Sequence, residues 1–294
     1  MEQNINMCKP LIGFMQGRLS PVVDDKIQAF PYGFWQSEFE LAAANEYRMI
    51  ELTLDHEDPF TNPLMNKDGQ SEILELSRKF SVKTPSVTGD CFMQKPFWKA
   101  DKSVRQRLIE DFYQIIEACG CVKATILVVP LVDNGGINSS KELEILIDVI
   151  YEAKSLLVES DVKIVFESDF GPNDLAVMIK KFDPLTVGIN YDVGNSASLG
   201  YDPYQEILAY GHRVLNVHVK DRPFGGSTVP LGHGDADFPN VFESLARIQY
   251  KGNFILQTAR AKEGKHIECL NVYRDFTAKH IQDNFDFDGS NSFG

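Results

Sequence analysis

Residues 187–195 read VGINYDVGN and have the period-two alternation of a buried β-strand. Apolar side chains fall on one face, and the opposite face carries Gly188, Asn190 and Asp192. A buried carboxylate is costly unless it is paired, hydrogen-bonded or bound to a cation. The stretch therefore predicts a strand over residues 186–192 that presents Asp192 to a positively charged partner at its carboxyl end. A turn is expected after it, at Gly194 and Asn195.

Seven further stretches have the character of a strand, namely residues 11–16, 49–54, 83–89, 124–130, 163–168, 214–220 and 253–258. Between the strands, apolar residues recur three and four positions apart, which is the spacing of an amphipathic helix. These helical stretches are residues 37–47, 71–80, 103–120, 140–160, 172–182, 202–211, 239–248 and 263–281. Eight alternations of strand and helix without a break in composition predict an α/β fold, a single-domain (β/α)8 TIM barrel.

The barrel is expected to occupy residues 11–283, after an N-terminal extension over 1–10 and before a flexible acidic tail over 284–294. Serines next to the helical patterns are predicted N-caps, and these are Ser37, Ser71 and Ser103.

The composition excludes several classes of protein. A net charge of −13 over 294 residues argues against a nucleic-acid partner. The chain has no run of about 20 apolar residues and no signal-peptide pattern at its start, so we expect a cytoplasmic protein without a membrane partner. Five scattered cysteines are expected to be free thiols. Neither a G-x-G-x-x-G nor a P-loop pattern is present, so no nucleotide cofactor is expected.

Polar residues collect where four consecutive strands end. In such a barrel the active site lies at the carboxyl ends of the strands. The candidate ligands on the inward face are Glu167, Asp192, His218 and Gln257. Each alone could be a capping or hydrogen-bonded core residue, but their convergence predicts a site for one divalent cation. This donor set suits Mn²⁺ or Mg²⁺, with Co²⁺ or Zn²⁺ as alternatives.

Other polar residues are candidates for contact with a substrate, namely Gln16, Arg18, Glu51, Asn195, His233 and Arg260. Glu51 could instead form an ion pair with Arg18 or Lys220. Arg260 could clamp a phosphate or a carboxylate, or lie solvated at the surface. For His233 a structural or exposed position is favoured over catalysis. Lys220 shares the inward face with His218 and is predicted to bind a substrate oxygen or phosphate or to act as an acid. The alternative is a salt bridge at the rim with Asp221 or with the neighbours of Asp192.

Six motifs together resemble the xylose-isomerase-like TIM barrels. They are GFMQGRLSP (13–21), VFESD (165–169), INYDVGN (189–195), HVKDR (218–222), PLGHGDADF (230–238) and FILQTAR (254–260). This family contains sugar and sugar-phosphate isomerases and epimerases related to D-tagatose 3-epimerase and L-ribulose-5-phosphate 3-epimerase. The resemblance implies that one divalent metal is held by Glu167, Asp192, His218 and Gln257. It also implies that Glu167 is a catalytic base.

Gln257 departs from the family pattern, which has a second catalytic glutamate there. An amide can offer its oxygen to a metal, but it has no proton to exchange in the useful range. Two-face epimerisation would then need a substitute such as Lys220, Glu51 or His233. The expected function is a metal-dependent sugar or sugar-phosphate isomerase or epimerase in carbohydrate metabolism. The alternatives are a metal-dependent sugar dehydratase or lyase, and a sugar-binding barrel with altered catalysis. The expected partners are a small polyhydroxylated substrate and further copies of the chain, in a homo-dimer or homo-tetramer.

Overall fold

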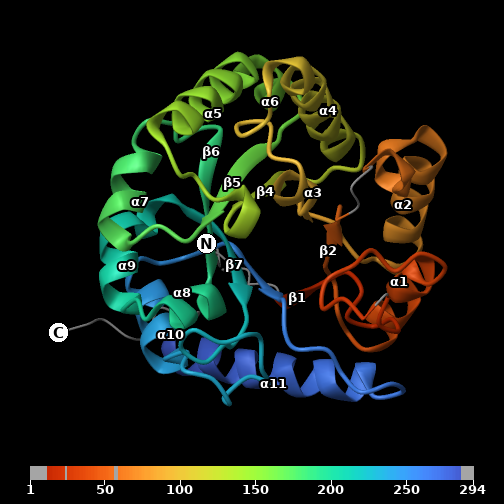
Figure 1. Cartoon of the computed structure of the whole chain (residues 1–294). Helices are drawn as coiled ribbons and strands as arrows, with labels where there is room; N and C mark the ends of the chain where they lie inside the picture. The colour runs from red at the N-terminus through yellow and green to blue at the C-terminus, as the bar shows by residue number, and fades with distance from the viewer. Residues whose placement is uncertain (1–11, 24, 56–58, 286–294) are drawn as a thin grey trace, which may run out of the picture.

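A computed structural model describes residues 12–23, 25–55 and 59–285 of the chain. Its eight strands are parallel and close into a barrel in sequence order, with β1 hydrogen-bonded to β8. They are β1 (Ile12–Met15), β2 (Ile50–Thr53), β3 (Ser86–Thr88), β4 (Ile126–Leu131), β5 (Lys163–Ser168), β6 (Val187–Asp192), β7 (Val214–Val219) and β8 (Asn253–Leu256). The predicted single-domain (β/α)8 barrel is confirmed (Figure 1). The predicted extension over 1–10 lies outside the described residues, as does the predicted tail over 284–294 except for its first two residues. The first of these, Asn284, still belongs to α11.

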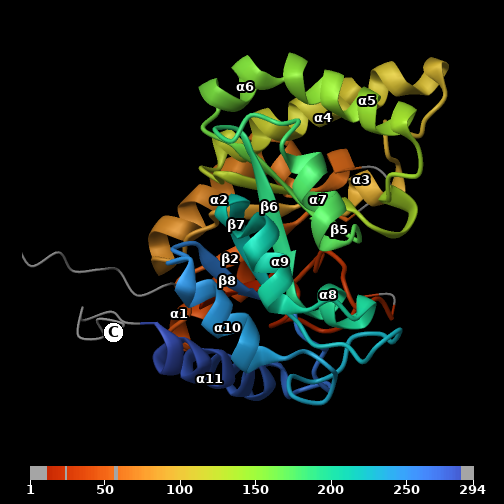
Figure 2. The ribbon, with the colours of Figure 1, turned by 90° about the vertical axis from the view of Figure 1, so that its left-hand side faces the viewer.

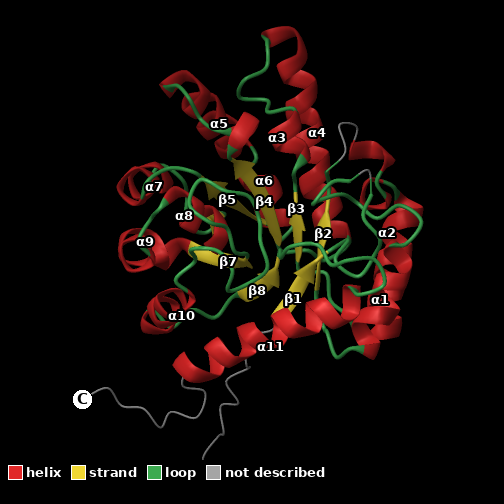
Figure 3. Ribbon diagram, turned by 60° about the horizontal axis from the view of Figure 1, so that its bottom comes forward, coloured by secondary structure: helices red, strands yellow, loops and turns green. Residues whose placement is uncertain are grey.

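Helices form a ring around the strands, as the red and yellow ribbons of Figure 3 show. They are α1 (Trp35–Ala44), α2 (Lys67–Phe80), α3 (Cys91–Gln94), α4 (Lys102–Cys121), α5 (Ser140–Glu152), α6 (Lys154–Glu159), α7 (Pro172–Ile179), α8 (Val193–Leu199), α9 (Pro203–Tyr210), α10 (Phe238–Arg247) and α11 (His266–Asn284). The single helix predicted over 140–160 is divided into α5 and α6 at Ala153. No helix of the described residues is long and apolar enough to cross a membrane.

The three predicted serine N-caps are wrong, because each serine lies inside its helix. Helix α2 begins one turn before Ser71, where the side chain of Asn66 accepts a hydrogen bond from the backbone of Gly69 at 2.8 Å. Ser71 instead donates to the carbonyl of Lys67. The apolar periodicity marks only the buried part of such a helix, so it misses a polar first turn that a neighbouring side chain caps.

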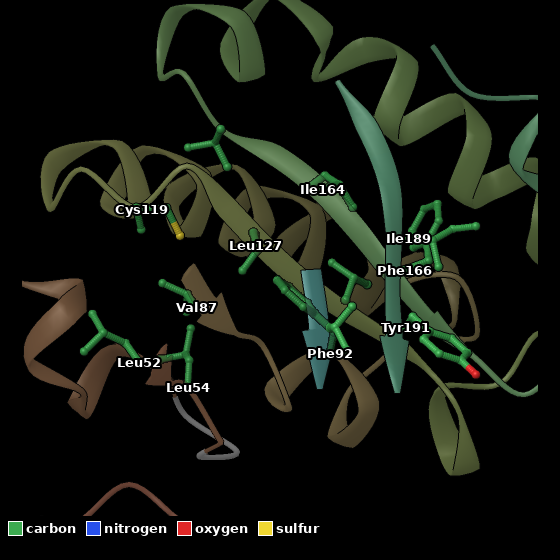
Figure 4. Packing of buried hydrophobic residues seen from close by; sticks show 14 of the residues in the cluster. Leu52, Leu54, Val87, Phe92, Cys119, Leu127, Ile164, Phe166, Ile189 and Tyr191 are labelled. Atoms are coloured by element: carbon green, nitrogen blue, oxygen red, sulfur yellow. The ribbon is translucent and has the colours of Figure 1, made fainter. Parts of the chain in front are cut away.

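The strands divide the core into two layers. Their outward side chains pack against the surrounding helices, as Leu52, Leu127 and Phe166 do in Figure 4. Inside the barrel, small apolar clusters form a floor, and their members are Met15, Met49, Ile255, Ile126, Val128 and Val165. Gly188 belongs to this floor, because a Cβ on it would collide with the side chain of Leu215. The apolar floor leaves the polar inward residues at the carboxyl ends of the strands.

Candidate active site

Three of the four predicted ligands lie together at the ends of β5, β6 and β7, which are neighbours in Figure 2. Glu167, Asp192 and His218 are all buried, and each offers one ligand atom within 4.8 Å of the other two. His218 Nδ1 lies 3.1 Å from Glu167 Oε2 and 4.0 Å from Asp192 Oδ2. The register pairs Asp192 with His218 directly, so the pleat brings both side chains to the same point inside the barrel.

Gln257 reaches this triad through Lys220. The Lys220 ammonium donates to Gln257 Oε1 at 2.9 Å and forms an ion pair with Asp192 Oδ2 at 2.7 Å. A positive charge therefore lies between two of the four predicted ligands. Lys220 does form a salt bridge, but with Asp192 itself and not with Asp221 or the neighbours of Asp192 that the sequence suggested.

Two asparagine side chains hold the carboxylate of Glu167. Asn190 donates to Oε2 at 2.8 Å, and Asn195 donates to Oε1 at 2.7 Å. Asn195 also connects Glu167 to Asp192, because its backbone N–H donates to Asp192 Oδ1 at 2.8 Å. Asp192 is thus the N-cap of α8, a short helix that replaces the turn expected after β6.

Glu51 is completely buried and supports His218 from the opposite side of the ring. Its Oε1 lies 2.7 Å from His218 Nε2 and accepts a hydrogen bond from Thr88 Oγ1 at 2.6 Å. Its Oε2 accepts a hydrogen bond from Asn216 Nδ2 at 3.0 Å. The alternative suggested for Glu51, an ion pair with Arg18 or Lys220, is therefore not found among the described residues, because Glu51 pairs with His218. A carboxylate that binds one imidazole nitrogen fixes the orientation of the ring and leaves the other nitrogen to face a metal.

The buried charges control the pKa values of the site. Burial alone would raise the pKa of Glu167, but the hydrogen bond from His218 and the charge of Lys220 hold it below its usual value. Burial would lower the pKa of His218, but Glu51 and Glu167 raise it to about 10. Burial raises the pKa of Asp192, partly offset by Lys220. Without a metal, the three carboxylates of Glu51, Glu167 and Asp192 are only partly balanced by the imidazolium of His218 and the ammonium of Lys220.

The donor set of the triad fits a divalent cation. Glu167 and Asp192 supply carboxylate oxygens, and His218 supplies Nδ1, while its Nε2 is held by Glu51. Asp192 Oδ2 is buried, and the Lys220 ammonium lies 2.7 Å from it. Two carboxylates and one imidazole are typical ligands of Mn²⁺, and they also bind Zn²⁺ and Co²⁺.

The remaining candidates occupy different parts of the barrel mouth. Gln16 is buried after β1, where its Oε1 accepts a hydrogen bond from the backbone of Thr53 at 3.1 Å. Arg260 is partly buried and donates hydrogen bonds to the carbonyls of Gly17 and Ser20 in the loop after β1. It is therefore not a solvated surface arginine. His233 is exposed in the loop after β7 and lies outside the triad.

Three functional candidates were missed by the sequence analysis. Arg222 donates to Asn195 Oδ1 at 2.8 Å, so it touches the residue that orients Glu167. The carboxylate of Asp221 accepts hydrogen bonds from four backbone N–H groups of the loop over 232–236. Asp90 follows β3, and burial and the charge of Glu167 raise its pKa to about 7. For Asp221 and Arg222 a signal existed, because both follow Lys220 directly in the motif HVKDR.

The chain belongs to the xylose isomerase-like TIM barrel family, whose model matches residues 39–275. It is 24% identical over 260 residues to "Putative L-ribulose-5-phosphate 3-epimerase SgbU" of Escherichia coli strain K12, a match that covers 78% of this chain and 86% of SgbU. It is 26% identical over 152 residues to inosose dehydratase of Geobacillus thermodenitrificans, which covers 44% of this chain and 51% of the dehydratase. Among solved structures, the IOLI protein with a bound zinc atom superposes with a TM-score of 0.73 at 16% identity, over 94% of this chain and 99% of that one.

Proposed function

We propose that the protein is a divalent-metal-dependent isomerase or epimerase of a sugar or a sugar phosphate. The buried triad of Glu167, Asp192 and His218 carries the proposal, and the likeness to an L-ribulose-5-phosphate 3-epimerase supports it. When bound, the ion supplies Lewis acidity that polarises a substrate carbonyl and acidifies the neighbouring C–H group. The oxygen-rich donor set favours Mn²⁺ or Mg²⁺, and the zinc atom of the IOLI protein makes Zn²⁺ an alternative.

Glu167 is the proposed base that removes the proton next to the carbonyl. Its lowered pKa keeps it ionised at neutral pH, so it can accept a proton there. The amides of Asn190 and Asn195 fix its orientation, which reduces the cost of aligning it with a substrate. Return of the proton to the adjacent carbon on the same face would complete an aldose–ketose isomerisation.

Lys220 is the proposed acid for the second proton, which moves between the substrate oxygens. Its ammonium is held between Asp192 and Gln257, next to the triad. Since Gln257 has no exchangeable proton in the useful range, epimerisation through opposite faces would require Lys220 as the second proton-transfer group.

Deuterium exchange tests this proposal. The Mn²⁺-loaded protein is incubated in D₂O with a panel of ketoses and ketose phosphates, and carbon-bound deuterium is measured by NMR. We expect incorporation by the wild type and none by Glu167→Gln. The control is Glu117→Gln, which changes an exposed glutamate of α4 and should behave like the wild type. If the loaded wild type incorporates no deuterium into any of these sugars, proton transfer is not the reaction.

A dehydratase is the second candidate, because Gln257 leaves one carboxylate base and because part of the chain resembles inosose dehydratase. One base and a Lewis acid can be sufficient for loss of water next to a carbonyl. This reaction gives an enone that absorbs in the ultraviolet, whereas isomerisation gives exchange without loss of water. A rise in absorbance during the same incubations would therefore favour the dehydratase.

A further inference from the structure

Arg18 is a buried cation without an acidic partner among the described residues. Only 5% of the Arg18 surface is exposed to solvent. Its Nε donates to the carbonyl of Thr258 and its Nη1 to Gln28 Oε1, both at 2.9 Å, and both acceptors are neutral. Within residues 12–23, 25–55 and 59–285, Nη2 makes no hydrogen bond and no carboxylate pairs with the guanidinium. Because a desolvated charge is costly, a buried arginine normally has an anionic partner.

The protein's own charges near Arg18 do not supply that partner. Two acids act on Arg18 electrostatically, the buried Glu38 and the half-buried Asp90, but neither forms a hydrogen bond or salt bridge with its guanidinium. Burial raises the pKa of Asp90 to about 7, which weakens it as a permanent counter-charge. The carboxylate of Glu38 accepts hydrogen bonds from the backbone N–H groups of Gly17 and Leu19 at 2.9–3.0 Å. Arg260 adds a second positive charge beside the same loop. Burial and, after it, the charge of Arg260 lower the pKa of Arg18 to about 9. Arg18 therefore remains a cation at neutral pH.

The position of Arg18 connects it to the proposed active site. Its carbonyl partner Thr258 directly follows Gln257, which accepts the hydrogen bond from Lys220. Its other partner, Gln28, donates to Thr53 Oγ1 at 2.7 Å, at the end of β2. The guanidinium thus lies at the carboxyl ends of β8, β1 and β2. In (β/α)8 barrels the loops after strands 7 and 8 frequently bind the phosphate of a substrate.

We infer that the substrate carries an anionic group, a phosphate or a carboxylate, and that Arg18 binds it. The inference rests on the proposed function for the sugar part of the ligand. A guanidinium with a free N–H edge donates charge-assisted hydrogen bonds to oxyanions, and the bound anion neutralises a charge that the fold leaves unpaired. With its anionic end at Arg18, the substrate extends past Lys220 toward Glu167.

Three ketoses with one carbon skeleton test the inference: D-fructose, D-fructose 6-phosphate and D-fructuronate. Each is titrated calorimetrically into the Mn²⁺-loaded protein. We expect at least one of the two anionic ketoses to bind about tenfold more tightly than fructose or better, and the tighter one identifies phosphate or carboxylate as the group. Arg18→Gln should abolish the preference. Arg107→Gln, which removes an exposed arginine of α4, should keep it.

Arg18→Lys keeps the positive charge but loses the planar fork of the guanidinium, so we expect a preference for the anionic ketose between those of the wild type and Arg18→Gln. If Arg18→Gln does not fold, the test uses Arg18→Lys in its place. Equal binding of the three ketoses would overturn the inference, even where deuterium exchange supports the proposed function. An Arg18-dependent preference without any exchange would contradict the proposed reaction and leave the anion site standing. If no ketose binds, the inference fails unless inorganic phosphate binds the wild type and not Arg18→Gln.

Discussion

Replacement of Glu51 by glutamine should weaken the binding of a divalent metal, although Glu51 is not among the proposed ligands. Glu51 accepts hydrogen bonds at both oxygens, from His218 and Thr88 at Oε1 and from Asn216 at Oε2. Glutamine has nearly the same shape but only one acceptor oxygen. If that oxygen faces His218, the new amide group meets the Nδ2 donor of Asn216 inside the protein. The loss of a charge-assisted hydrogen bond costs about 1.5–3 kcal/mol, which corresponds to about 10- to 100-fold in affinity.

Calorimetric titration with Mn²⁺ measures this effect, and Glu206→Gln is its matched control. Glu206 is also a buried glutamate that accepts three hydrogen bonds, from Tyr191, Ser196 and Tyr210, and it does not contact the triad. Both substitutions are expected to lower the free energy of unfolding, but only Glu51→Gln should raise the Kd for the metal. A folded Glu51→Gln protein with the Kd of the wild type would refute the reasoning that Glu51 orients His218 for a metal.

Glu167→Gln should slow deuterium exchange by about 10²- to 10⁴-fold, and NMR that finds an unchanged rate would assign the base to another residue. The metal affinity should rise with pH from about 6 to 9, because the ion displaces a proton from His218, whose pKa is raised to about 10; a Kd that does not vary with pH would contradict this. Asp90→Asn should stabilise the protein at high pH. The pKa of Asp90 is raised from 3.8 to about 7, so the folded protein holds a proton that the unfolded chain releases, and the wild type loses stability as the pH rises through this window. Urea unfolding measures the free energy of unfolding of the variant relative to the wild type, and this difference should grow by about 2 kcal/mol between about pH 5 and pH 8. A difference that shrinks toward the higher pH would contradict the raised pKa of Asp90.

The alternation of side chains along the strands was sufficient to predict most of the fold. The predicted strand over 163–168 coincides with β5, and the strand over 186–192 differs from β6 by one residue. The same alternation predicted that Asn190, Asp192 and His218 face the inside, because a pleated strand sends every second side chain to the same face. Glu167, Asp192 and His218 could therefore be grouped before the structure was known.

Side-chain pairing across the barrel could not be predicted in the same way. Glu51 and His218 are 167 positions apart, and the residues around Glu51 do not indicate which strand end it faces. The step from β6 to α8 was missed for a local reason. An aspartate followed by Val-Gly-Asn suits a turn, and it suits a helix N-cap equally well when other contacts hold the helix. Lys220 was placed on the correct face, but its flexible side chain left its partner open between several carboxylates.

The balance of buried charge gives a reason for glutamine at position 257. The ends of β2, β5 and β6 contribute three carboxylates, and the metal-free protein offsets them with an imidazolium on His218 and the ammonium of Lys220. A divalent ion that replaces the imidazolium proton would bring the group to neutrality with Lys220 still in place. A glutamate at position 257 would add a further negative charge beside an ammonium that is already paired with Asp192. An unpaired buried charge is costly. Gln257 therefore suits this position, because its neutral amide oxygen accepts a hydrogen bond from Lys220 without adding a negative charge.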